Sequence, residues 1–385
     1  MRFIHTADWH LGRSMYSVRL TDDQAYALDN LVSVARDAKP DVLIVSGDVY
    51  DRSVPPPEAV ELLDDVFSKF VLDLRIPVIC IAGNHDSAPR LEFGSRVMAG
   101  RNLHVFGTVS SQPSPVTVAD QWGPVVFYPI PFGETSVLRQ QLACENIKDH
   151  NDALRELIQR IRSRQSHGER SVIVGHVFVV GGSESESERP LSIGGSDRVD
   201  PACFDGFNYA ALGHLHRPQE AGTSRIRYPG SLLKYSFSEA NHTKSIDVVE
   251  MDARGYSRVE SVPIVPRRDV RVISGCVKDI LKGPGPGENS EDYVMVVVQD
   301  QGPILDLMGK LREVYPNCLH VERAQSAASP AALERGCDYR SMRDADLFAL
   351  FFREVTGEEL SEQEAEAYNV IADEVLRQER EVSSL

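Results

Sequence analysis

Residues 42–51 read VLIVSGDVYD. The segment Val42–Ser46 is a continuous apolar run that ends in a small residue, a pattern typical of a strand buried on both faces. Asp48 and Asp51 follow it at once. In α/β proteins, functional side chains collect at the carboxyl ends of the strands. The stretch therefore predicts a central core strand whose carboxyl end carries functional residues.

The segments on either side of this strand alternate between strand and helix patterns. Arg2–Thr6 and Pro77–Ala82 are short apolar runs of strand length. Asp22–Ala38 has apolar residues at helical spacing, and so has Pro55–Phe70, whose prolines are tolerated in a first helical turn. The order strand, helix, strand, helix, strand predicts an α/β core with parallel pairing and right-handed crossovers.

The rest of the chain divides into a strand-rich region, a small domain and a tail. One helix is expected near Asn151–Arg164, and strands are expected at Val125–Ile130, Ser171–Gly175, Tyr209–Gly213, Arg225–Pro229 and Ile246–Met251. The segment Pro263–Asp269 has the composition of a linker. We therefore expect a catalytic domain over residues 1–265, a small α+β domain over 270–325 and a helical hairpin over 340–385.

The composition is that of an ordinary globular protein, with 42% hydrophobic and 25% charged residues among 385. The six cysteines are scattered without a Cys-x-x-Cys pair, as expected for the reduced thiols of a cytoplasmic protein. The first residues are too polar for a secretory signal, and no apolar stretch reaches the ~18 residues of a membrane span. We expect a cytoplasmic protein with no membrane partner.

The formal net charge is −16, which argues against a nucleic-acid partner because phosphate binders are usually basic. However, residues 346–385 contain eleven acids and three bases, a net of −8 (3 − 11), so half of the excess lies in the tail. Divalent cations bound to carboxylates of the core would offset more of it. The net charge therefore does not exclude a nucleic-acid substrate.

Metal-binding residue types end several of the predicted strands. The segments are Asp8-Trp9-His10, Gly47-Asp48, Gly83-Asn84-His85-Asp86, Gly175-His176 and Gly213-His214-Leu215-His216. Each alone is a weak signal, because a buried histidine can donate to a backbone carbonyl and an aspartate after a strand often caps a helix. Their joint occurrence, each after a strand, predicts a two-metal site.

Two divalent ions about 3.5–4 Å apart need a bridging carboxylate and further protein ligands for each ion. Asp48 is the natural bridge. One ion would be completed by Asp8, His10 and His216, and the other by Asn84, His176 and His214. This mixture of carboxylate, amide oxygen and imidazole suits Mn²⁺ or Fe²⁺ better than Mg²⁺. Glycines precede the ligands at 47, 83, 175 and 213, where the absence of a Cβ permits close backbone approach.

Other polar residues in the motifs suggest supporting roles. A two-metal site of this kind can hydrolyse a phosphate ester with a water molecule as the attacking group. His85 follows Asn84 directly, so its ring can lie on the side of the phosphate opposite that water, and we assign it as the general acid. Asp51 would either orient His85 or a water at the metals, or cap the helix that follows. Asp86 is expected to stabilise its turn, and His5 to be a satisfied core residue.

Two further segments are interpreted between alternatives. Gly181–Gly195 carries three Ser-Glu pairs and is interpreted as a solvated surface loop. The alternative is a flexible loop that contacts the substrate strand beside the metals, and it is disfavoured because an acidic loop would repel nucleic-acid phosphates. In the tail, Asp346–Val355 is rich in Leu and Phe, and Ser361-x-x-Glu364 is a capping box before a second helix. This hairpin either packs on its own catalytic domain or binds a partner.

Six segments carry a resemblance to a known family. They are Asp8-x-His10 with Leu11-Gly12-Arg13, Ser46–Asp51, Ala82–Ser87, Gly175-His176, Leu212–Arg217 and Tyr228–Ser231. Together they resemble the calcineurin-like metallophosphoesterase superfamily and, within it, the SbcD family of bacterial double-strand-break repair nucleases. The resemblance extends over nearly the whole chain, including the small domain and the tail.

The resemblance implies an α/β fold class, with a metallophosphoesterase β-sandwich flanked by helices, a small α+β capping domain and a C-terminal helical hairpin. It implies two divalent ions, with Mn²⁺ first and Mg²⁺ or Fe²⁺ as alternatives. The activity would be DNA exonuclease on double-strand ends and endonuclease on hairpins and single strands, in repair, recombination and replication. The partner would be the ATPase SbcC, bound by the C-terminal helices, and a homodimer would form a heterotetramer with it.

Two other functions compete with this one. A phosphodiesterase for small molecules or cyclic nucleotides would share every candidate ligand, but it would not explain residues 270–385. An inactive scaffold would need neither the ligands nor His85. For the homodimer, the apolar segments Ala59–Phe70 and Ala88–Ala99 are the expected contact helices.

Overall fold

The computed structural model describes residues 1–191, 197–300, 302 and 304–324, and in the C-terminal segment residues 345, 347–349, 352–353, 359–361, 363–369 and 371–372. The chain forms two compact units, Met1–Ala324 and Gln325–Leu385.

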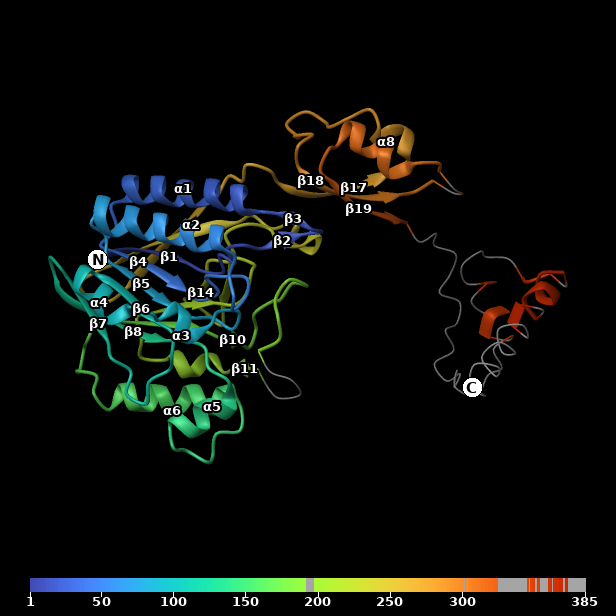
Figure 1. The fold of residues 1–385 in the computed structure, drawn as a ribbon. Helices are drawn as coiled ribbons and strands as arrows, with labels where there is room; N and C mark the ends of the chain where they lie inside the picture. Colours follow the sequence, from blue (N-terminus) through green and yellow to red (C-terminus); the bar gives the residue numbers. More distant parts are fainter. Residues whose placement is uncertain are drawn as a thin grey trace. The chain divides into compact units, whose positions relative to one another are not determined.

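The first unit is built around two six-stranded sheets (Figure 1). The first sheet has the order β16-β15-β1-β4-β5-β6. Its strands are β1 (Arg2–Thr6), β4 (Val42–Ser46), β5 (Val78–Ile81), β6 (Leu103–Phe106), β15 (Ser245–Met251) and β16 (Ser257–Pro263). Strands β1, β4, β5 and β6 run parallel, while β15 and β16 add antiparallel neighbours beside β1.

The second sheet has the order β13-β14-β12-β9-β8-β7. Its strands are β7 (Val116–Asp120), β8 (Gly123–Ile130), β9 (Ser171–His176), β12 (Tyr209–Gly213), β13 (Gln219–Ala221) and β14 (Thr223–Tyr228). The four inner strands are parallel and the two edge strands are antiparallel to their neighbours. The predicted parallel core is thus present, extended by antiparallel edges.

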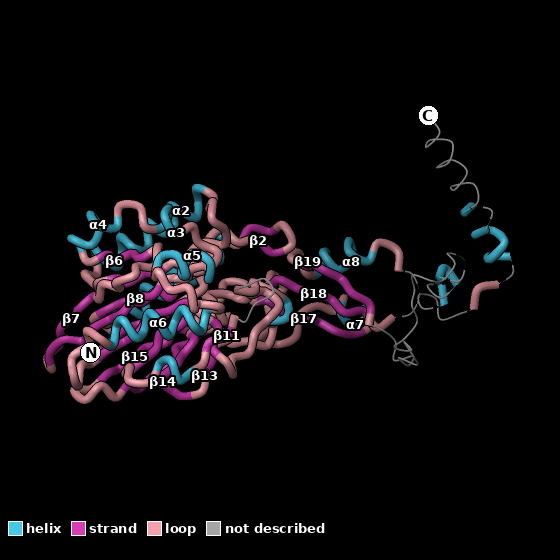
Figure 2. Tube along the Cα trace, turned by 90° about the horizontal axis from the view of Figure 1, so that it is seen from below, coloured by secondary structure: helices cyan, strands magenta, loops and turns pink. Residues whose placement is uncertain are grey.

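Helices cover the outer face of each sheet. The long helices α1 (Thr21–Ala38) and α2 (Pro57–Ser68) lie on the first sheet, and α5 (Thr135–Gln141) and α6 (His150–Arg162) lie on the second (Figures 1 and 2). Helix α6 begins where Asp149 accepts a hydrogen bond from the main chain of Asp152. Its buried side chains include Leu154, Leu157, Ile158 and Ile161.

The core lies in three layers that follow the alternation of side chains along the strands. In β1, Phe3 faces the second sheet and packs in a cluster with Phe127 and Tyr209. Ile4 faces the other way and packs under α1 and α2. A third cluster lies between the second sheet and α6. This is a sandwich of two sheets between helices, as the family resemblance implied.

Shorter elements complete this part of the unit. The strands are β2 (Ser14–Met15), β3 (Val18–Arg19), β10 (Phe178–Val179) and β11 (Arg198–Val199), and the short helices are α3 (Ala88–Leu91) and α4 (Ser95–Met98). A π-helical turn, η1 (Lys69–Asp73), follows α2, and 3-10 turns are η2 (Ala99–Arg101), η3 (Pro201–Phe204) and η4 (Phe237–Glu239).

Residues 270–323 form a three-stranded parallel sheet in the order β17-β18-β19, with two helices. Its elements are β17 (Val270–Gly275), α7 (Val277–Ile280), β18 (Tyr293–Val298), α8 (Leu307–Val314) and β19 (Cys318–Arg323). The central strand β18 is buried against α7 and α8 in a core of its own. Its first residue, Tyr293, donates its hydroxyl to Asp23 of α1 at 2.9 Å.

In the second unit, the described residues are helical at 345, 347–349 and 352–353, and again at 363–369 and 371–372. The rings of Phe348 and Tyr368 stack with centroids 4.1 Å apart, so the two helical segments touch. Ser361 and Glu364 exchange the hydrogen bonds of a capping box, as predicted. The segment between the predicted small domain and the start of the hairpin at 340 lies outside the described residues. Within the described part of the chain, every helix is too short or too polar to cross a bilayer.

Candidate metal centre

The candidate ligands lie where the carboxyl ends of strands from both sheets meet. Asp8 and His10 follow β1, Asp48 follows β4, and Asn84 follows β5. From the second sheet, His176 is the last residue of β9. The remaining two candidates, His214 and His216, follow β12. The ends of the sheets are held together there, because the Ser46 hydroxyl donates to the carbonyl of Ala211 at 3.1 Å.

Four of these residues have a backbone conformation that non-glycine residues rarely adopt. The φ angles are 52° at Asp8, 46° at His10, 48° at Asp48 and 109° at His214. Each such conformation costs on the order of 1–3 kcal/mol and is typical of functional sites, where the surrounding structure enforces it. Here the main-chain N–H of His10 donates to the carbonyl of Asp48 at 2.9 Å and fixes two of these turns together.

Glycine is required by packing at some of the predicted positions and not at others. A Cβ on Gly83 would lie 2.2 Å from Asp48 Oδ1, and one on Gly213 would lie 1.9 Å from the carbonyl oxygen of Ser46. At Gly175 the nearest atom would be a Leu212 methyl carbon at 3.4 Å, which is an ordinary contact. The expectation that Gly175 permits a close approach was therefore wrong.

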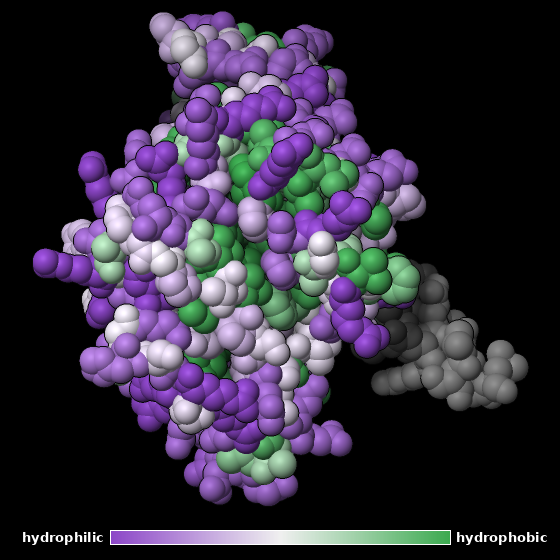
Figure 3. All heavy atoms as spheres, turned by 90° about the vertical axis from the view of Figure 1, so that its left-hand side faces the viewer, coloured by the Kyte–Doolittle hydropathy of each residue, from purple (hydrophilic) through white to green (hydrophobic). Residues whose placement is uncertain are grey.

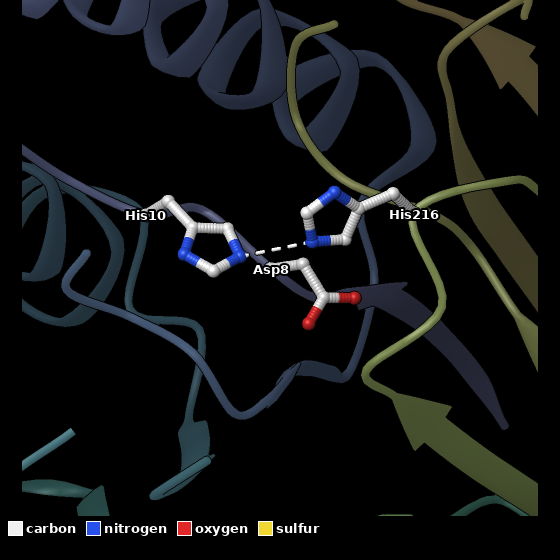
Figure 4. Close-up of side chains that lie close together, drawn as sticks. All are labelled: Asp8, His10 and His216. Carbon is white, nitrogen blue, oxygen red and sulfur yellow. Dashed lines mark hydrogen bonds between the residues drawn. The ribbon is translucent and has the colours of Figure 1, made fainter. Parts of the chain in front are cut away.

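The donor atoms converge on two adjacent points with Asp48 between them. Around one point, His10 Nε2 and His216 Nε2 are 3.0 Å apart, with the Asp8 carboxylate beside them (Figure 4). Around the other, His176 Nε2 is 2.9 Å from Asn84 Oδ1. Asp48 Oδ2 lies 3.7 Å from His10 Nε2 and 3.5 Å from His176 Nε2, a position suited to a bridging carboxylate.

His214 approaches the cluster less directly. Its main-chain N–H donates to both carboxylate oxygens of Asp8, at 2.9 and 3.1 Å. Its ring lies 5.5 Å from that of His176, centroid to centroid. His214 is therefore adjacent to the His176 side of the cluster, but its nitrogens are not within the groups of close donors found among the described residues.

The other ring nitrogens show which donors are free to bind a cation. His176 Nδ1–H donates to the carbonyl of Ser46 at 2.9 Å, and His216 Nδ1 is 2.6 Å from Ser187 Oγ. Their Nε2 atoms therefore face the cluster as acceptors. In the described chain, the buried His10 Nδ1 has no hydrogen-bond partner. Two inward-facing Nε2 atoms only 3.0 Å apart fit a cation held between them.

The charges at this point also fit a divalent cation. Burial raises the pKa of Asp8 to about 7, although the His176 and His216 rings oppose the rise. Burial acts on Asp48 in the same direction, but the rings of His176, His85 and His10 outweigh it and hold its pKa well below the usual range. Buried carboxylates beside imidazoles are the donor set of borderline divalent ions.

His85 lies beside this cluster with its ring turned towards it. Its main-chain N–H donates to Asp48 Oδ1 at 2.9 Å, and its ring Nδ1–H donates to the carbonyl of Asp51 at 2.8 Å. This leaves Nε2 facing the cluster, 3.9 Å from Asp48 Oδ2. Burial lowers the pKa of His85, and the Asp48 carboxylate opposes this.

Asp51 contacts His85 through its main chain, while its carboxylate lies elsewhere. Asp51 Oδ1 accepts from Arg13 at 3.0 Å and is 3.7 Å from His10 Nδ1. The N-cap of α2 is Pro56, which makes no side-chain cap, so Asp51 does not cap this helix. The position of Asp51 favours a role in orienting His85 and His10.

The two residues expected to be structural have structural contacts. Asp86 accepts hydrogen bonds from the main-chain N–H groups of Val49, Tyr50 and Gly83 at 2.9–3.1 Å, and so joins the turns after β4 and β5. His5 is buried between the sheets, with Nδ1 3.0 Å from the Tyr209 hydroxyl.

Comparison with known proteins agrees with this geometry. A family model described as calcineurin-like phosphoesterase matches residues 1–218, and one described as type 5 capsule protein repressor C-terminal domain, SbcD_C, matches residues 266–356. A curated relative, the SbcD subunit of the nuclease SbcCD from Staphylococcus saprophyticus, is 32% identical over 378 residues, which are 98% of this chain and 99% of the relative. The chain belongs to the SbcD family of calcineurin-like phosphoesterases.

Two solved structures are similar to this SbcD-family chain at 14% identity. The calcineurin-like phosphoesterase YfkN from Bacillus subtilis has a TM-score of 0.38, and the match covers 68% of this chain and 88% of that one. A dimetal phosphatase from Danio rerio has a TM-score of 0.41, with 69% and 98% covered. The family model and the observed sandwich confirm the predicted fold class, and membership of this family implies divalent metals.

The structure also places residues at the centre that the sequence analysis of this SbcD-family chain did not find. Gly181–Gly195 was interpreted as a surface loop, and most of its described residues are exposed. However, Ser187 is buried against His216 Nδ1, and Glu188 accepts from the main-chain N–H of His216 at 2.7 Å. The loop interpretation was therefore wrong at these two residues, and residues 192–196 lie outside the described part.

A buried ion pair completes this contact. Glu239 accepts from the Ser187 hydroxyl and from the Lys244 ammonium, and both charged residues are buried. Burial would raise the pKa of Glu239, but the Lys244 ammonium and the hydrogen bond from His216 Nδ1 outweigh it and lower the pKa well below its usual range. No motif in the sequence marks this pair, because neither residue lies within a few positions of a candidate ligand.

Proposed function

We propose that this chain is a metal-dependent DNA phosphodiesterase. The observation that carries the proposal is the meeting of candidate ligands from both sheets at one point, with the His85 ring turned towards Asp48. The relative's name, a nuclease subunit, supports DNA as the substrate. A phosphodiesterase for small molecules would need the same ligands, so the substrate itself has to be tested.

In the proposed mechanism, the chain would hold two divalent ions with Asp8, His10, Asp48, Asn84, His176, His214 and His216. Ions bound there would supply activation of the attacking water and stabilisation of charge on the phosphoryl oxygens. Asp51 holds the Nδ1–H of His85 through its carbonyl, which directs Nε2 towards the substrate side. His85 then donates a proton from Nε2 to the leaving oxygen.

We infer Mn²⁺ as the ion, with Mg²⁺ and Fe²⁺ as alternatives to be compared with it. Four imidazoles beside two carboxylates and one amide oxygen suit a borderline ion, whereas Mg²⁺ prefers oxygen ligands and retains several waters. The net charge of −16 argues against a nucleic-acid substrate. Two divalent cations at this point would offset it locally, because they would attract a phosphate to the site.

The partner proposals follow from the relative, which is a subunit of SbcCD. We propose that the C-terminal hairpin, residues 340–385, binds the ATPase SbcC, and that the complex acts as an exonuclease on double-strand ends and an endonuclease on hairpins and single strands. In the described part of the hairpin, the apolar side chains of Leu347 and Ile371 are exposed, which supports a contact surface for a partner. The cytoplasm is the expected location of such a repair enzyme.

We also propose a homodimer, which would form a heterotetramer with SbcC. Phe93 is 84% exposed and Val97 is 82% exposed, next to and within α4. Hydrophobic side chains gather in the middle of the face seen in Figure 3, on the side where Figure 1 places α4. Large apolar side chains this exposed are typical of contact surfaces. Leu91, also expected at this surface, is buried in the core instead.

The test uses the purified full-length chain, with and without SbcC, on a labelled DNA hairpin in Mn²⁺. His85→Ala should lower the cutting rate about 10²–10⁴-fold and keep both ions, because a proton donor is lost and no ligand is. His167→Ala, a change at an exposed histidine, is the matched control. Cyclic nucleotides cleaved in preference to DNA, or a His85→Ala variant that cuts normally, would contradict the proposal.

A further inference from the structure

A chain of hydrogen bonds leads from the metal centre into the protein interior. His216 Nδ1 lies 2.6 Å from Ser187 Oγ, and the Ser187 hydroxyl donates to Glu239. Because that hydroxyl hydrogen is committed to Glu239, Ser187 Oγ acts as the acceptor for the Nδ1–H of His216. The proton of the His216 ring is therefore fixed on Nδ1, and Nε2 presents a lone pair towards His10 and Asp8.

Glu239, at the far end of this series of hydrogen bonds, is held in place by Lys244. The Lys244 ammonium contacts Glu239 and also donates to the carbonyl of His216 at 2.7 Å and to Ser231 Oγ at 2.8 Å. Glu239 is fully buried, Lys244 is 5% exposed, and Ser187 is 6% exposed. A buried charged pair with all its hydrogen bonds made costs much more to break than a surface pair, so this arrangement resists movement.

The main chain of His216 is held from the loop side as well. Glu188 Oε1 accepts from the His216 N–H at 2.7 Å, and Glu188 Oε2 accepts from the main-chain N–H and hydroxyl of Ser185 at 2.6 Å. His216 thus has its ring nitrogen, its N–H and its carbonyl all anchored. The anchors come from two separate segments, Ser185–Glu188 and Glu239–Lys244.

We propose that Ser187 and Glu239 are positioning residues for one of the two metal ions, acting through the ring of His216. Residues that fix the tautomer and orientation of a ligating histidine raise its basicity and typically change metal affinity about 10–100-fold. The side chains of Ser187 and Glu188 are then an integral part of the metal centre. This inference rests on the proposed metal centre, and it assigns the effect to the ion that His216 shares with Asp8 and His10.

The variants are Ser187→Ala and Glu239→Gln, with Glu186→Gln as a matched control from the same loop. Glu186 is exposed, so its change removes one carboxylate charge near the site without touching His216. Mn²⁺ is titrated into each metal-free protein by calorimetry, the electron paramagnetic resonance spectrum of the paired ions is recorded, and the melting temperature of each metal-free protein is measured.

In Ser187→Ala, one Mn²⁺ should bind about 10–100-fold more weakly while the other is unchanged, and the spectrum of the coupled pair should fade at limiting Mn²⁺. Glu186→Gln should match the wild type. If Glu239→Gln does not fold because Lys244 has lost its partner, Ser187→Ala decides alone. The inference is overturned if Ser187→Ala binds both ions as the wild type does, or weakens both equally with a lower melting temperature. A wild type that binds no Mn²⁺ would instead overturn the metal centre itself.

Discussion

Gly83→Ala should damage the metal centre without removing any candidate ligand. The new methyl carbon would lie 2.2 Å from Asp48 Oδ1 and 2.3 Å from Asp48 N. Ordinary contacts begin near 3.4 Å, so Asp48 and its turn would have to move by roughly 1 Å, at a cost of about 1–3 kcal/mol in stability. A displacement of that size in a reacting site can lower the rate about 10²-fold. Because Asp48 lies between both donor groups, both ions should bind more weakly.

Gly175→Ala is the matched control, since it makes the same chemical change one residue before another candidate ligand. Its methyl carbon would meet only a Leu212 methyl carbon at 3.4 Å. Calorimetric Mn²⁺ titration, hairpin cutting and melting temperature are measured for both variants. Gly83→Ala should lose affinity and rate, whereas Gly175→Ala should stay within a factor of a few of the wild type. Equal behaviour of the two variants would refute the reasoning from close approach.

Four further outcomes are expected. Asp48→Asn should reduce the occupancy of both ions and His10→Ala chiefly that of one, as metal analysis by mass spectrometry would show; two ions at full occupancy in Asp48→Asn would mean that the ligand scheme is wrong. Arg170 donates to Asp120 at 2.9 and 2.6 Å and holds the pKa of that carboxyl below its usual range. Since the folded-state pKa is the lower one, this pair stabilises the fold above about pH 4 and its contribution is lost as the pH falls. Asp120→Asn should therefore cost about 1–3 kcal/mol at pH 7 and clearly less near pH 2 in denaturant titrations, and an equal loss at both pH values would contradict this. Truncation after Ala332 should abolish co-elution with SbcC and leave the melting temperature and basal Mn²⁺-dependent cutting unchanged; a lower melting temperature with SbcC binding intact would mean that the tail packs on its own catalytic domain. Light scattering at micromolar concentration should give the mass of a dimer, and a monomer would count against the proposed interface.

The strands that hold the candidate site were predictable because they are buried on both faces. Such strands, among them β4, β5, β9 and β12, appear in the sequence as short continuous apolar runs. The edge strands β6, β7, β13 and β16 were missed. In β16, exposed and half-buried residues alternate with no apolar run, so nothing distinguishes it from a loop.

The candidate ligands were predictable for a different reason, because a polar residue directly after a buried strand stands out in the sequence. The partners of those ligands do not stand out. Ser187 lies in a Ser-Glu tract that is typical of surface loops, and Glu239 comes 52 residues later with no motif around it. Only the fold brings them to His216. In the sequence, Gly83 and Gly175 both stand directly before a candidate ligand and cannot be distinguished, although packing requires a glycine at 83 and not at 175.

The first sheet has a consequence for how the protein is made. Strand β1 is paired on one side with β4 and on the other with β15, and its partners in β15 lie 242 to 248 positions later in the chain, from Asp247 opposite His5 to Glu250 opposite Arg2. A ribosome adds about 5–20 residues per second, so β15 is synthesised on the order of 10–50 s after β1. Until then the main-chain N–H and C=O groups on that side of β1 are unpaired, and such an edge can pair with another chain. We therefore expect the incomplete chain to need chaperones during synthesis. A chain released before residue 216 lacks one of the candidate ligands, so premature fragments would not carry the complete site.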